Sequence, residues 1–160
     1  VRERQRGNNR HIEIERFVGR ALRTTFDLKA INGMTLHMDA DVLQADGSTR
    51  CASLNGSMVS LVKMLKYLVY ETIIPDLPEI QWIAAVSIGV IDNELLADLN
   101  YFEDFDADAD INIISSEKGH SVEVQAFCEE KTISRELFQS AVDLGVEKNI
   151  EIIQKLKKHV

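Results

Sequence analysis

The sequence has few of the residues and patterns that mark a zinc centre, a disulfide-rich scaffold or a membrane protein. Its two cysteines, Cys51 and Cys128, are far apart and match no metal-ligand spacing, and its four histidines are scattered. We therefore expect no zinc site, and reduced thiols in a reducing compartment, the cytoplasm. No apolar run approaches the ~20 residues of a membrane-spanning helix, and no signal-peptide pattern is found, so we expect no membrane partner.

Two nucleotide-binding patterns are also missing. Neither the phosphate-loop pattern GxxxxGK(S/T) nor the dinucleotide pattern GxGxxG occurs in the chain. Both patterns use glycines to bring backbone N–H groups close to phosphate oxygens. Their absence removes most of the support for a nucleoside-triphosphatase or a dinucleotide-binding fold.

The net charge of −8 argues against a nucleic-acid partner, but this charge is unevenly distributed. Residues 1–23 hold seven of the nine arginines and none of the nine lysines, and with three glutamates they carry +4, which leaves −12 for the remainder. Arginine binds phosphate bidentately, so this asymmetry favours a local RNA or phosphate surface on an acidic body. A solvated basic tail leading into a salt-bridged helix is at least as good an interpretation.

Length and periodicity predict a single α+β domain. The 160 residues, 45% of them apolar, suffice for one buried core. Helical spacing predicts helices over residues 12–26, 48–70 and 134–157, the last capped by Ser134. Strands are predicted over residues 34–43, 83–91, 95–101, 111–115 and 121–127. This order indicates helices packed on a largely antiparallel sheet.

The stretch from Val42 to Asn55, VLQADGSTRCASLN, carries the clearest functional signal. A strand-like run ends at the turn Asp46-Gly47, and Ser48 then stands at the N-cap position of a helix. The first N–H groups of a helix have no intrahelical partner and its N-terminus is partly positive, so Ser48, Thr49 and Arg50 together form a candidate phosphate site. The alternative is a capped helix start with no ligand, which is the commoner case.

An acidic run, Glu103 to Asp110, is the second candidate site. If the run is extended, Asp104, Asp106, Asp108 and Asp110 lie on one side, where clustered carboxylates favour a divalent cation such as Mg²⁺ or Mn²⁺. An EF-hand is excluded, because Ile111 stands where the calcium loop requires glycine. The alternative is a solvated acidic loop.

These segments together resemble the ribonuclease PH family of phosphate-dependent 3′-end exoribonucleases and, less closely, polynucleotide phosphorylase and exosome ring subunits. The motifs run in register across nearly the whole chain: RHIEIERFVGRALR (10–23), DADVLQADGSTRCASLNG (39–56), AAVSIGVI (84–91), DLNYFED with DADIN (98–112) and VEVQ (122–125). The resemblance implies a ribonuclease PH-like α+β fold with a mixed sheet and packed helices.

The resemblance also implies roles for particular residues. The family's phosphate-binding arginine falls on Arg10, and its phosphate loop falls on Ser48, Thr49 and Arg50. Its acidic pair, which acts as metal ligands or as a general acid, falls on Asp104 and Asp110. RNA-binding arginines are expected at Arg2, Arg4, Arg6 and Arg16. The sequence departs from the family at Ser48, usually a second glycine, at Cys51, usually Thr or Ser, and at Asn8-Asn9, where glycine is frequent.

For the whole protein the resemblance implies phosphate-dependent trimming of tRNA 3′ ends. Inorganic phosphate would be the co-substrate, Mg²⁺ or Mn²⁺ the cofactor, and a homohexameric ring the assembly. Family chains have an upstream β-rich half, and this chain begins at Val1 in an arginine-rich segment. We therefore expect an N-terminally incomplete domain over residues 1–160, with residues 1–10 as a basic loop. The alternatives are a non-catalytic RNA-binding ring subunit and an inactive truncated fragment. The enzyme hypothesis requires Arg10, Thr49 and Asp110 to converge on one pocket.

Overall fold

The computed structural model describes residues 9–128 and 132–160 of the chain. Predicted RNA-binding residues Arg2, Arg4 and Arg6, and nearly all of the predicted basic loop 1–10, lie outside the described residues. Within the described part, none of the helices is both long enough and apolar enough to cross a membrane.

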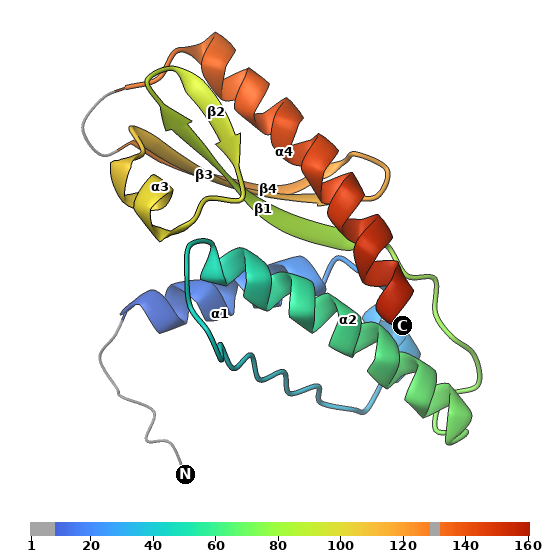
Figure 1. Cartoon of the computed structure of the whole chain (residues 1–160). Coiled ribbons are helices and arrows are strands. Elements are labelled where there is room, and N and C mark those ends of the chain that lie inside the picture. Colours follow the sequence, from blue (N-terminus) through green and yellow to red (C-terminus); the bar gives the residue numbers. More distant parts are fainter. Residues whose placement is uncertain (1–8, 129–131) are drawn as a thin grey trace.

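One antiparallel sheet and the helices on its two faces make up the described fold (Figure 1). The strand order is β2-β1-β3-β4, and all three neighbouring pairs are antiparallel. The strands are β1 (Ile83–Ile91), β2 (Glu94–Ala97), β3 (Ala109–Ser116) and β4 (Ser121–Cys128). The helices are α1 (Asn9–Leu22), α2 (Thr49–Tyr70), α3 (Tyr101–Asp106) and α4 (Arg135–Leu156), with short 3-10 turns at Leu28–Ile31 and Lys157–His159.

Strand β1 is buried on both faces, as its continuous apolar run predicts. Ile83 and Ala85 pack in a core with α1 and α2, whereas Val86 and Ile88 pack in a second core with α4. Alternate side chains of a strand point to opposite faces, so β1 supplies both cores. Figure 1 accordingly shows α4 along one face of the sheet and the pair α1 and α2 below the other.

Local signals place most of the remaining elements correctly. Asp92 and Asn93 have φ values of 50° and 65° and form the tight turn between β1 and β2. Ser134 caps α4, since its side chain accepts a hydrogen bond from the N–H of Leu137 at 3.0 Å. The predicted α+β class is therefore confirmed.

The predicted strand over residues 34–43 is wrong. The segment forms no β-ladder with any described strand and follows an irregular path that passes α2 on the side away from the sheet (Figure 1). A strand needs a partner edge, and here α2 lies between the segment and the sheet. Leu43 is 94% exposed, and Met38 packs against the first core.

One predicted helix boundary also changes, and one side chain gains a role. Helix α1 ends at Leu22 and not near Phe26, because the hydroxyls of Thr24 and Thr25 donate to the carbonyls of Ala21 and Leu22 at 2.7 and 2.6 Å. Early in α2, it is Asn55 that joins the helix to the sheet, donating to the carbonyl of Ala85 at 2.9 Å and accepting from its N–H at 2.8 Å.

Candidate active site

The face of the sheet that looks toward α2 changes from apolar to polar along β1 and β3. Beyond Ile83 and Ala85, the next β1 position on this face is Ser87, which pairs in register with Asn112 of β3. Asp110 pairs with Gly89, the β1 residue two positions further on. Polar side chains on two adjacent strands therefore lie beneath the start of α2.

These side chains line one small cavity of about 30 Å³. Its lining brings together Arg10, Ser48, Thr49, Arg50, Ser87, Asp104, Asp110 and Asn112. The predicted convergence of Arg10, Thr49 and Asp110 is therefore found in the structure. The chemical roles of these side chains remain predictions.

Sequence reasoning missed two of the lining residues, Ser87 and Asn112. The available signal was their placement: each is a polar residue between two buried apolar residues of its strand. Both are 2% exposed, and a buried polar side chain requires a hydrogen-bond partner. The sequence alone did not give the β1–β3 register that turns them toward α2.

Ser48 stands at the N-cap position of α2, but its side chain does not cap the helix. Its backbone is in the left-handed region, with φ of 58° and ψ of 27°, and no side-chain hydrogen bond to the helix forms. The hydroxyl instead contacts the hydroxyl of Ser87 and lies 3.4 Å from the carbonyl oxygen of Leu99. The N–H groups of the first turn of α2 are thereby left for an anion, as helix N-termini often provide.

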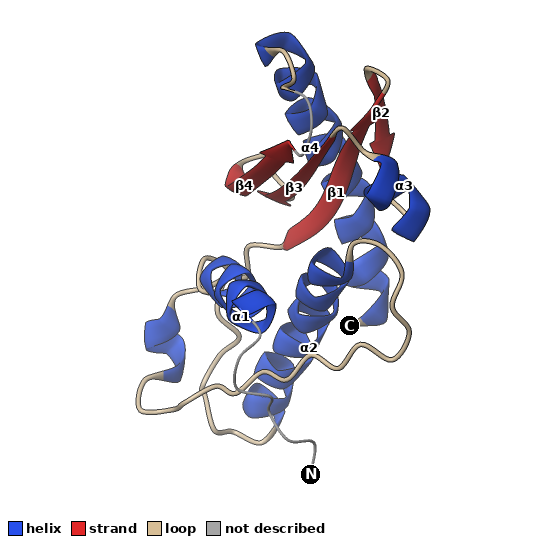
Figure 2. Cartoon of the chain, turned by 90° about the vertical axis from the view of Figure 1, so that its left-hand side faces the viewer, coloured by secondary structure: helices blue, strands red, loops and turns tan. Residues whose placement is uncertain are grey.

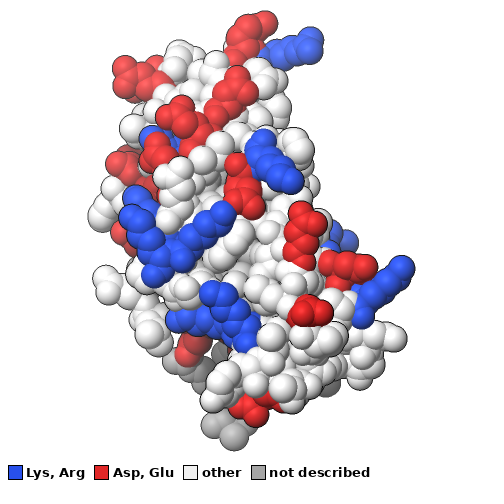
Figure 3. All heavy atoms as spheres, turned by 90° about the vertical axis from the view of Figure 1, so that its right-hand side faces the viewer, with Lys and Arg blue, Asp and Glu red and all other residues white. Residues whose placement is uncertain are grey.

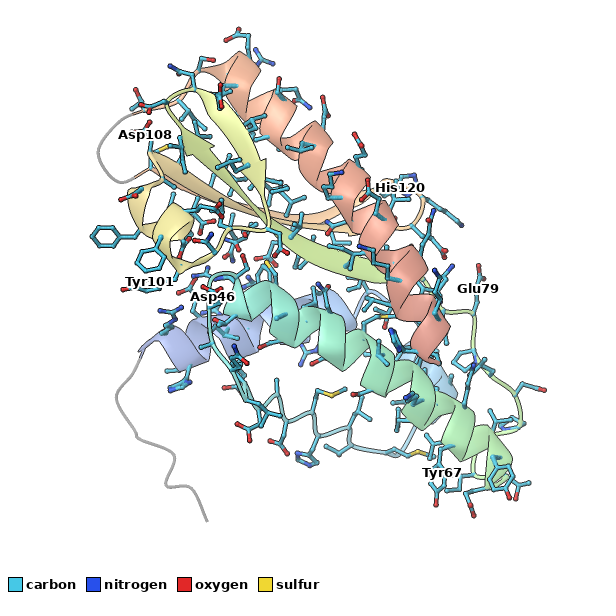
Figure 4. The ribbon with its side chains drawn as sticks, in the orientation of Figure 1. Asp46, Tyr67, Glu79, Tyr101, Asp108 and His120 are labelled. Atoms are coloured by element: carbon cyan, nitrogen blue, oxygen red, sulfur yellow. The ribbon has the colours of Figure 1, made fainter. Side chains whose placement is uncertain are left out.

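The turn before α2 is held tightly against the segment that leads into α3. A Cβ atom at Gly47 would lie 2.0 Å from the carbonyl oxygen of Leu99, so only glycine fits there. The carboxylate of Asp46 accepts a hydrogen bond from the N–H of Tyr101 at 2.7 Å, and the two residues lie side by side in Figure 4. This contact fixes the start of α2 relative to α3, which carries Asp104.

Arg50 reaches the cavity from the first turn of α2. Its guanidinium Nη1 donates to Glu13 Oε1 at 2.9 Å and to Gln125 Oε1 at 3.4 Å. Its side chain is only 18% exposed, which reduces the solvent screening of its charge. The contacts with α1 and β4 hold the guanidinium in place before any ligand binds.

The acidic run is not extended throughout, so the condition for Asp104, Asp106, Asp108 and Asp110 to lie on one side is not met. Residues Tyr101–Asp106 form the short helix α3, in which the Asn100 side chain accepts from the N–H groups of Phe102 and Glu103, and Glu103 accepts from the N–H of Asn100. Asp104 therefore lies on a helix and Asp110 on β3. Both nevertheless line the cavity, whereas Asp106 and Asp108 do not.

The donor set suits a hard divalent cation. Mg²⁺ is commonly held by one or two carboxylates, with water and substrate phosphate completing its shell, and Asp104 and Asp110 supply two. Across residues 9–128 and 132–160, no group of three or more His, Cys, Asp and Glu side chains is arranged to hold a metal ion. A cation here would therefore depend on ligands from the substrate.

Arg16 and Arg20 lie beside the cavity and not in it. They line a larger groove of about 480 Å³ between α1 and β4, with Ile12, Glu13, Gln125 and Phe127. Arg20 is bound to Glu123, with Nε at 3.2 Å and Nη2 at 2.5 Å from its carboxylate oxygens, and this hydrogen bonding raises the pKa of Arg20. Arg16, for which the family resemblance implies an RNA contact, therefore lies in this groove.

The two sides of the molecule differ in what they offer a ligand. Figure 2 shows the side on which α1, the start of α2 and α3 meet below the sheet, where the cavity lies. Figure 3 shows the opposite side, on which acidic and basic side chains are interspersed. On the cavity side, Arg10, Arg50, Asp104 and Asp110 instead line the same cavity.

Comparison with known proteins identifies the class to which this fold and site belong. Residues 1–65 match the model of domain 1 of the 3′ exoribonuclease family, and residues 81–148 match that of its domain 2. The chain therefore belongs to the 3′ exoribonuclease family.

Within this family, the chain is similar to proteins that are named ribonuclease PH. The chain is 38% identical to ribonuclease PH of Bacillus cytotoxicus over 161 residues, and 40% identical to that of Moorella thermoacetica over 162 residues. These alignments cover 99% and 100% of this chain but 66% and 64% of the relatives, so the chain spans about two thirds of their length.

Solved structures confirm the ribonuclease PH-like fold. The Archaeoglobus fulgidus exosome with RNA bound to its active site matches 97% of this chain and 65% of that chain, with a TM-score of 0.68 and 17% identity. An archaeal exosome core matches 93% of this chain and 64% of that chain, with a TM-score of 0.65 and 17% identity. At these identities the likeness concerns the fold.

Proposed function

We propose that the protein is a phosphate-dependent 3′-to-5′ exoribonuclease that trims tRNA precursors and releases nucleoside diphosphates. The observation that carries this proposal is the single cavity in which Arg10, Arg50 and the N-terminus of α2 face Asp104 and Asp110. Positive groups and carboxylates in one cavity suit a reaction in which one phosphate attacks another. The relationship to proteins named ribonuclease PH supports the same reaction.

In the proposed reaction, inorganic phosphate is held by Arg10, by Arg50 and by the N–H groups of Ser48 and Thr49. One of its oxygens forms a bond to the phosphorus of the last phosphodiester of the RNA, and the bond from that phosphorus to the 3′-oxygen of the preceding nucleotide breaks. The proton of the attacking hydrogen phosphate passes by way of Asp110 to the 3′-oxygen, and the last nucleotide leaves as a diphosphate. Phosphate thus replaces water as the nucleophile.

Asp104 and Asp110 are the residues that would hold Mg²⁺ or Mn²⁺. Such an ion would offset the negative charge that develops on the phosphate oxygens. The chain's own contribution is to hold both carboxylates in the cavity that Arg10 and Arg50 also line, through the capped helix α3 and the β1–β3 pairing.

The proposed partners are RNA and further copies of the chain. Arg16, in the groove beside the cavity, is placed to contact the RNA strand, and Arg2, Arg4 and Arg6 are proposed to extend this contact. A homohexameric ring is proposed because structures of similar fold are parts of exosome assemblies.

A non-catalytic RNA-binding subunit of an exosome-like ring is the alternative, because the similar folds belong to exosomes. A subunit without chemistry is expected to lose the phosphate loop or the acidic pair, yet this cavity contains both. An inactive fragment is the third hypothesis, since the chain spans about two thirds of its relatives.

One assay separates these hypotheses. The protein is incubated with a tRNA precursor, Mg²⁺ and inorganic phosphate, and the products are separated by chromatography. We expect nucleoside diphosphates that disappear when phosphate is omitted. Nucleoside monophosphates would indicate hydrolysis, and intact RNA would favour the non-catalytic subunit or the inactive fragment.

Asp110→Asn tests the acidic pair. This near-isosteric change removes the charge and the proton donor, so we expect loss of phosphorolysis with an unchanged circular-dichroism spectrum. The matched control is Asp106→Asn, which changes a carboxylate of the same acidic run that does not line the cavity. Wild-type turnover by the Asp110→Asn protein would refute the role assigned to Asp110.

A further inference from the structure

A hydrogen-bonded chain of three side chains includes two residues that line the cavity, Asp110 and Asn112. Asn112 donates from Nδ2 to Oδ2 of Asp110 at 2.7 Å, and its Oδ1 accepts from the thiol of Cys51 at 3.3 Å. Cys51 and Asn112 are 3% and 2% exposed. The chain thus runs from the first turn of α2, through β3, to the carboxylate at the cavity.

The hydrogen-bond chemistry allows only one orientation of the Asn112 amide. An ionised carboxylate only accepts hydrogen bonds, so the NH₂ group must face Asp110. The amide oxygen then faces Cys51, which must donate. Burial, followed by the nearby charge of Asp110, raises the pKa of Cys51 from 9.0 to about 12, so the sulfur carries its proton at neutral pH.

We propose that Asn112 is a positioning residue for the phosphorolytic reaction, which fixes the Asp110 carboxylate toward the cavity and is itself oriented by Cys51. The inference rests on the proposed function, because Asp110 is the group whose chemistry it serves. Residues that hold a reactive carboxylate by hydrogen bonds commonly change activity or metal affinity by about 10- to 100-fold when they are replaced.

The first test is Asn112→Leu, which keeps the size of the side chain and removes the amide. We expect kcat to fall by about 10- to 100-fold while KM for phosphate stays within about twofold, because Arg10, Arg50 and the α2 N-terminus are unchanged. Mn²⁺ binding, followed by the electron paramagnetic resonance signal of the free ion, should weaken by about tenfold.

A matched control lies on the other face of the same strand. Asn149 of α4 is also fully buried, and its Nδ2 donates to the carbonyl of Ile113 and to Ser115 Oγ, each at 3.0 Å. Asn149→Leu removes the same buried amide on the side of β3 away from the cavity. We expect lower thermal stability with unchanged kcat and Mn²⁺ affinity, which separates positioning from packing.

Substitutions at Cys51 test the second link. Cys51→Ser keeps a donor and should preserve kcat within about threefold, whereas Cys51→Val removes the donor and should lower kcat by about tenfold. Equal rates for these two variants would contradict the role of Cys51.

The Asp110→Asn variant distinguishes a failure of the positioning role of Asn112 from a failure of the proposed phosphorolytic function. If Asp110→Asn is inactive and Asn112→Leu keeps wild-type kcat and Mn²⁺ affinity, the positioning role of Asn112 is wrong. If Asp110→Asn itself keeps wild-type turnover, the proposed function has failed first.

Discussion

The residues around the cavity are held by contacts with one another, and these contacts come from distant parts of the chain. Ser48 meets Ser87, Cys51 meets Asn112, and Arg50 is held by Glu13 of α1. Such contacts hold side chains in place before the ligand arrives, so less conformational freedom is lost on binding. Single substitutions here are therefore expected to change binding or rate without unfolding the domain.

Arg50→Ala should abolish phosphate-dependent trimming, with a loss in kcat/KM for phosphate of about 100-fold or more. The reason is that the change removes the guanidinium group that is held in place to bind the phosphate anion. Arg50→Lys should recover only part, since lysine lacks the planar fork. The assay is the initial rate of diphosphate release at varied phosphate concentration. Arg23→Ala, at an exposed position outside the cavity, serves as the control. An unchanged KM and rate in Arg50→Ala would exclude Arg50 from the phosphate site.

The two cysteines should differ in reactivity. Cys128 is exposed, whereas Cys51 is buried and has its pKa raised to about 12. A thiol reagent at pH 8 should modify Cys128 rapidly in the native protein and Cys51 only after denaturation, because the thiolate is the reactive form. Counting modified thiols, with Cys128→Ser as the control, checks this. Rapid modification of the native Cys128→Ser protein would contradict it.

The raised pKa of Cys51 also predicts that the free energy of unfolding depends on pH in the alkaline range. Because Cys51 holds its proton in the folded state up to about pH 12 but releases it near pH 9.0 when unfolded, the unfolded state binds fewer protons between these values. The free energy of unfolding should therefore fall as pH rises from 9 toward 12. Cys51→Ala should show a smaller fall in urea titrations. Equal slopes for the two proteins would exclude this contribution.

Among the larger elements, the contact between the turn before α2 and the segment before α3 determines whether the site exists. Gly47 allows this contact with Leu99, and Asp46 adds a hydrogen bond to Tyr101. The two candidate sites, the phosphate loop and the acidic run, are thereby joined into one.

Gly47→Ala should push these segments apart. Its Cβ would meet backbone atoms, which cannot rotate away, so we expect lower stability and a KM for phosphate raised about tenfold or more. Gly56→Ala is the matched control: a Cβ there meets nothing within 4 Å, and alanine within a helix is favoured over glycine by about 0.5–1 kcal/mol. Thermal melts and phosphate titration of both variants provide the measurement. A Gly47→Ala protein that behaves like Gly56→Ala would refute the close approach.

For the molecule as a whole, charge and fold suggest how the site is used. The chain carries −8 overall, yet four of its nine arginines, Arg10, Arg16, Arg20 and Arg50, line the cavity or the adjacent groove. On an acidic body, a local cluster of arginines would favour the binding of the proposed phosphate and RNA there. The ring proposed above would bring several such sites together.

The ring proposal predicts a particle of six copies. Light scattering coupled to size-exclusion chromatography should give six times the mass of one chain. Dilution should shift the mass through smaller assemblies, because association depends on concentration. A monomer at every concentration tested would contradict the ring while leaving the cavity chemistry to its own tests.

The sequence by itself determined the elements whose signals are local. Helices α2 and α4 follow from apolar spacing, and the β1–β2 hairpin follows from its Asp92-Asn93 turn. The phosphate-loop residues Ser48, Thr49 and Arg50 were predicted from the turn and the helix start, whereas the pair Asp104 and Asp110 was predicted from the resemblance to the ribonuclease PH family, and their roles stay predictions. The periodicity and turn signals each involve residues that are close in the chain, so they can be recognised without knowledge of the fold.

Only the tertiary structure decided the rest. Residues 34–43 alternate like a strand but have no partner edge, and the acidic run became a capped helix beside Asp46 and not an extended segment. Ser87 and Asn112 became candidate site residues only through the register of β1 with β3, which turns both side chains toward α2. Strand pairing and cavity lining depend on which distant segments meet, and a local pattern does not specify such encounters.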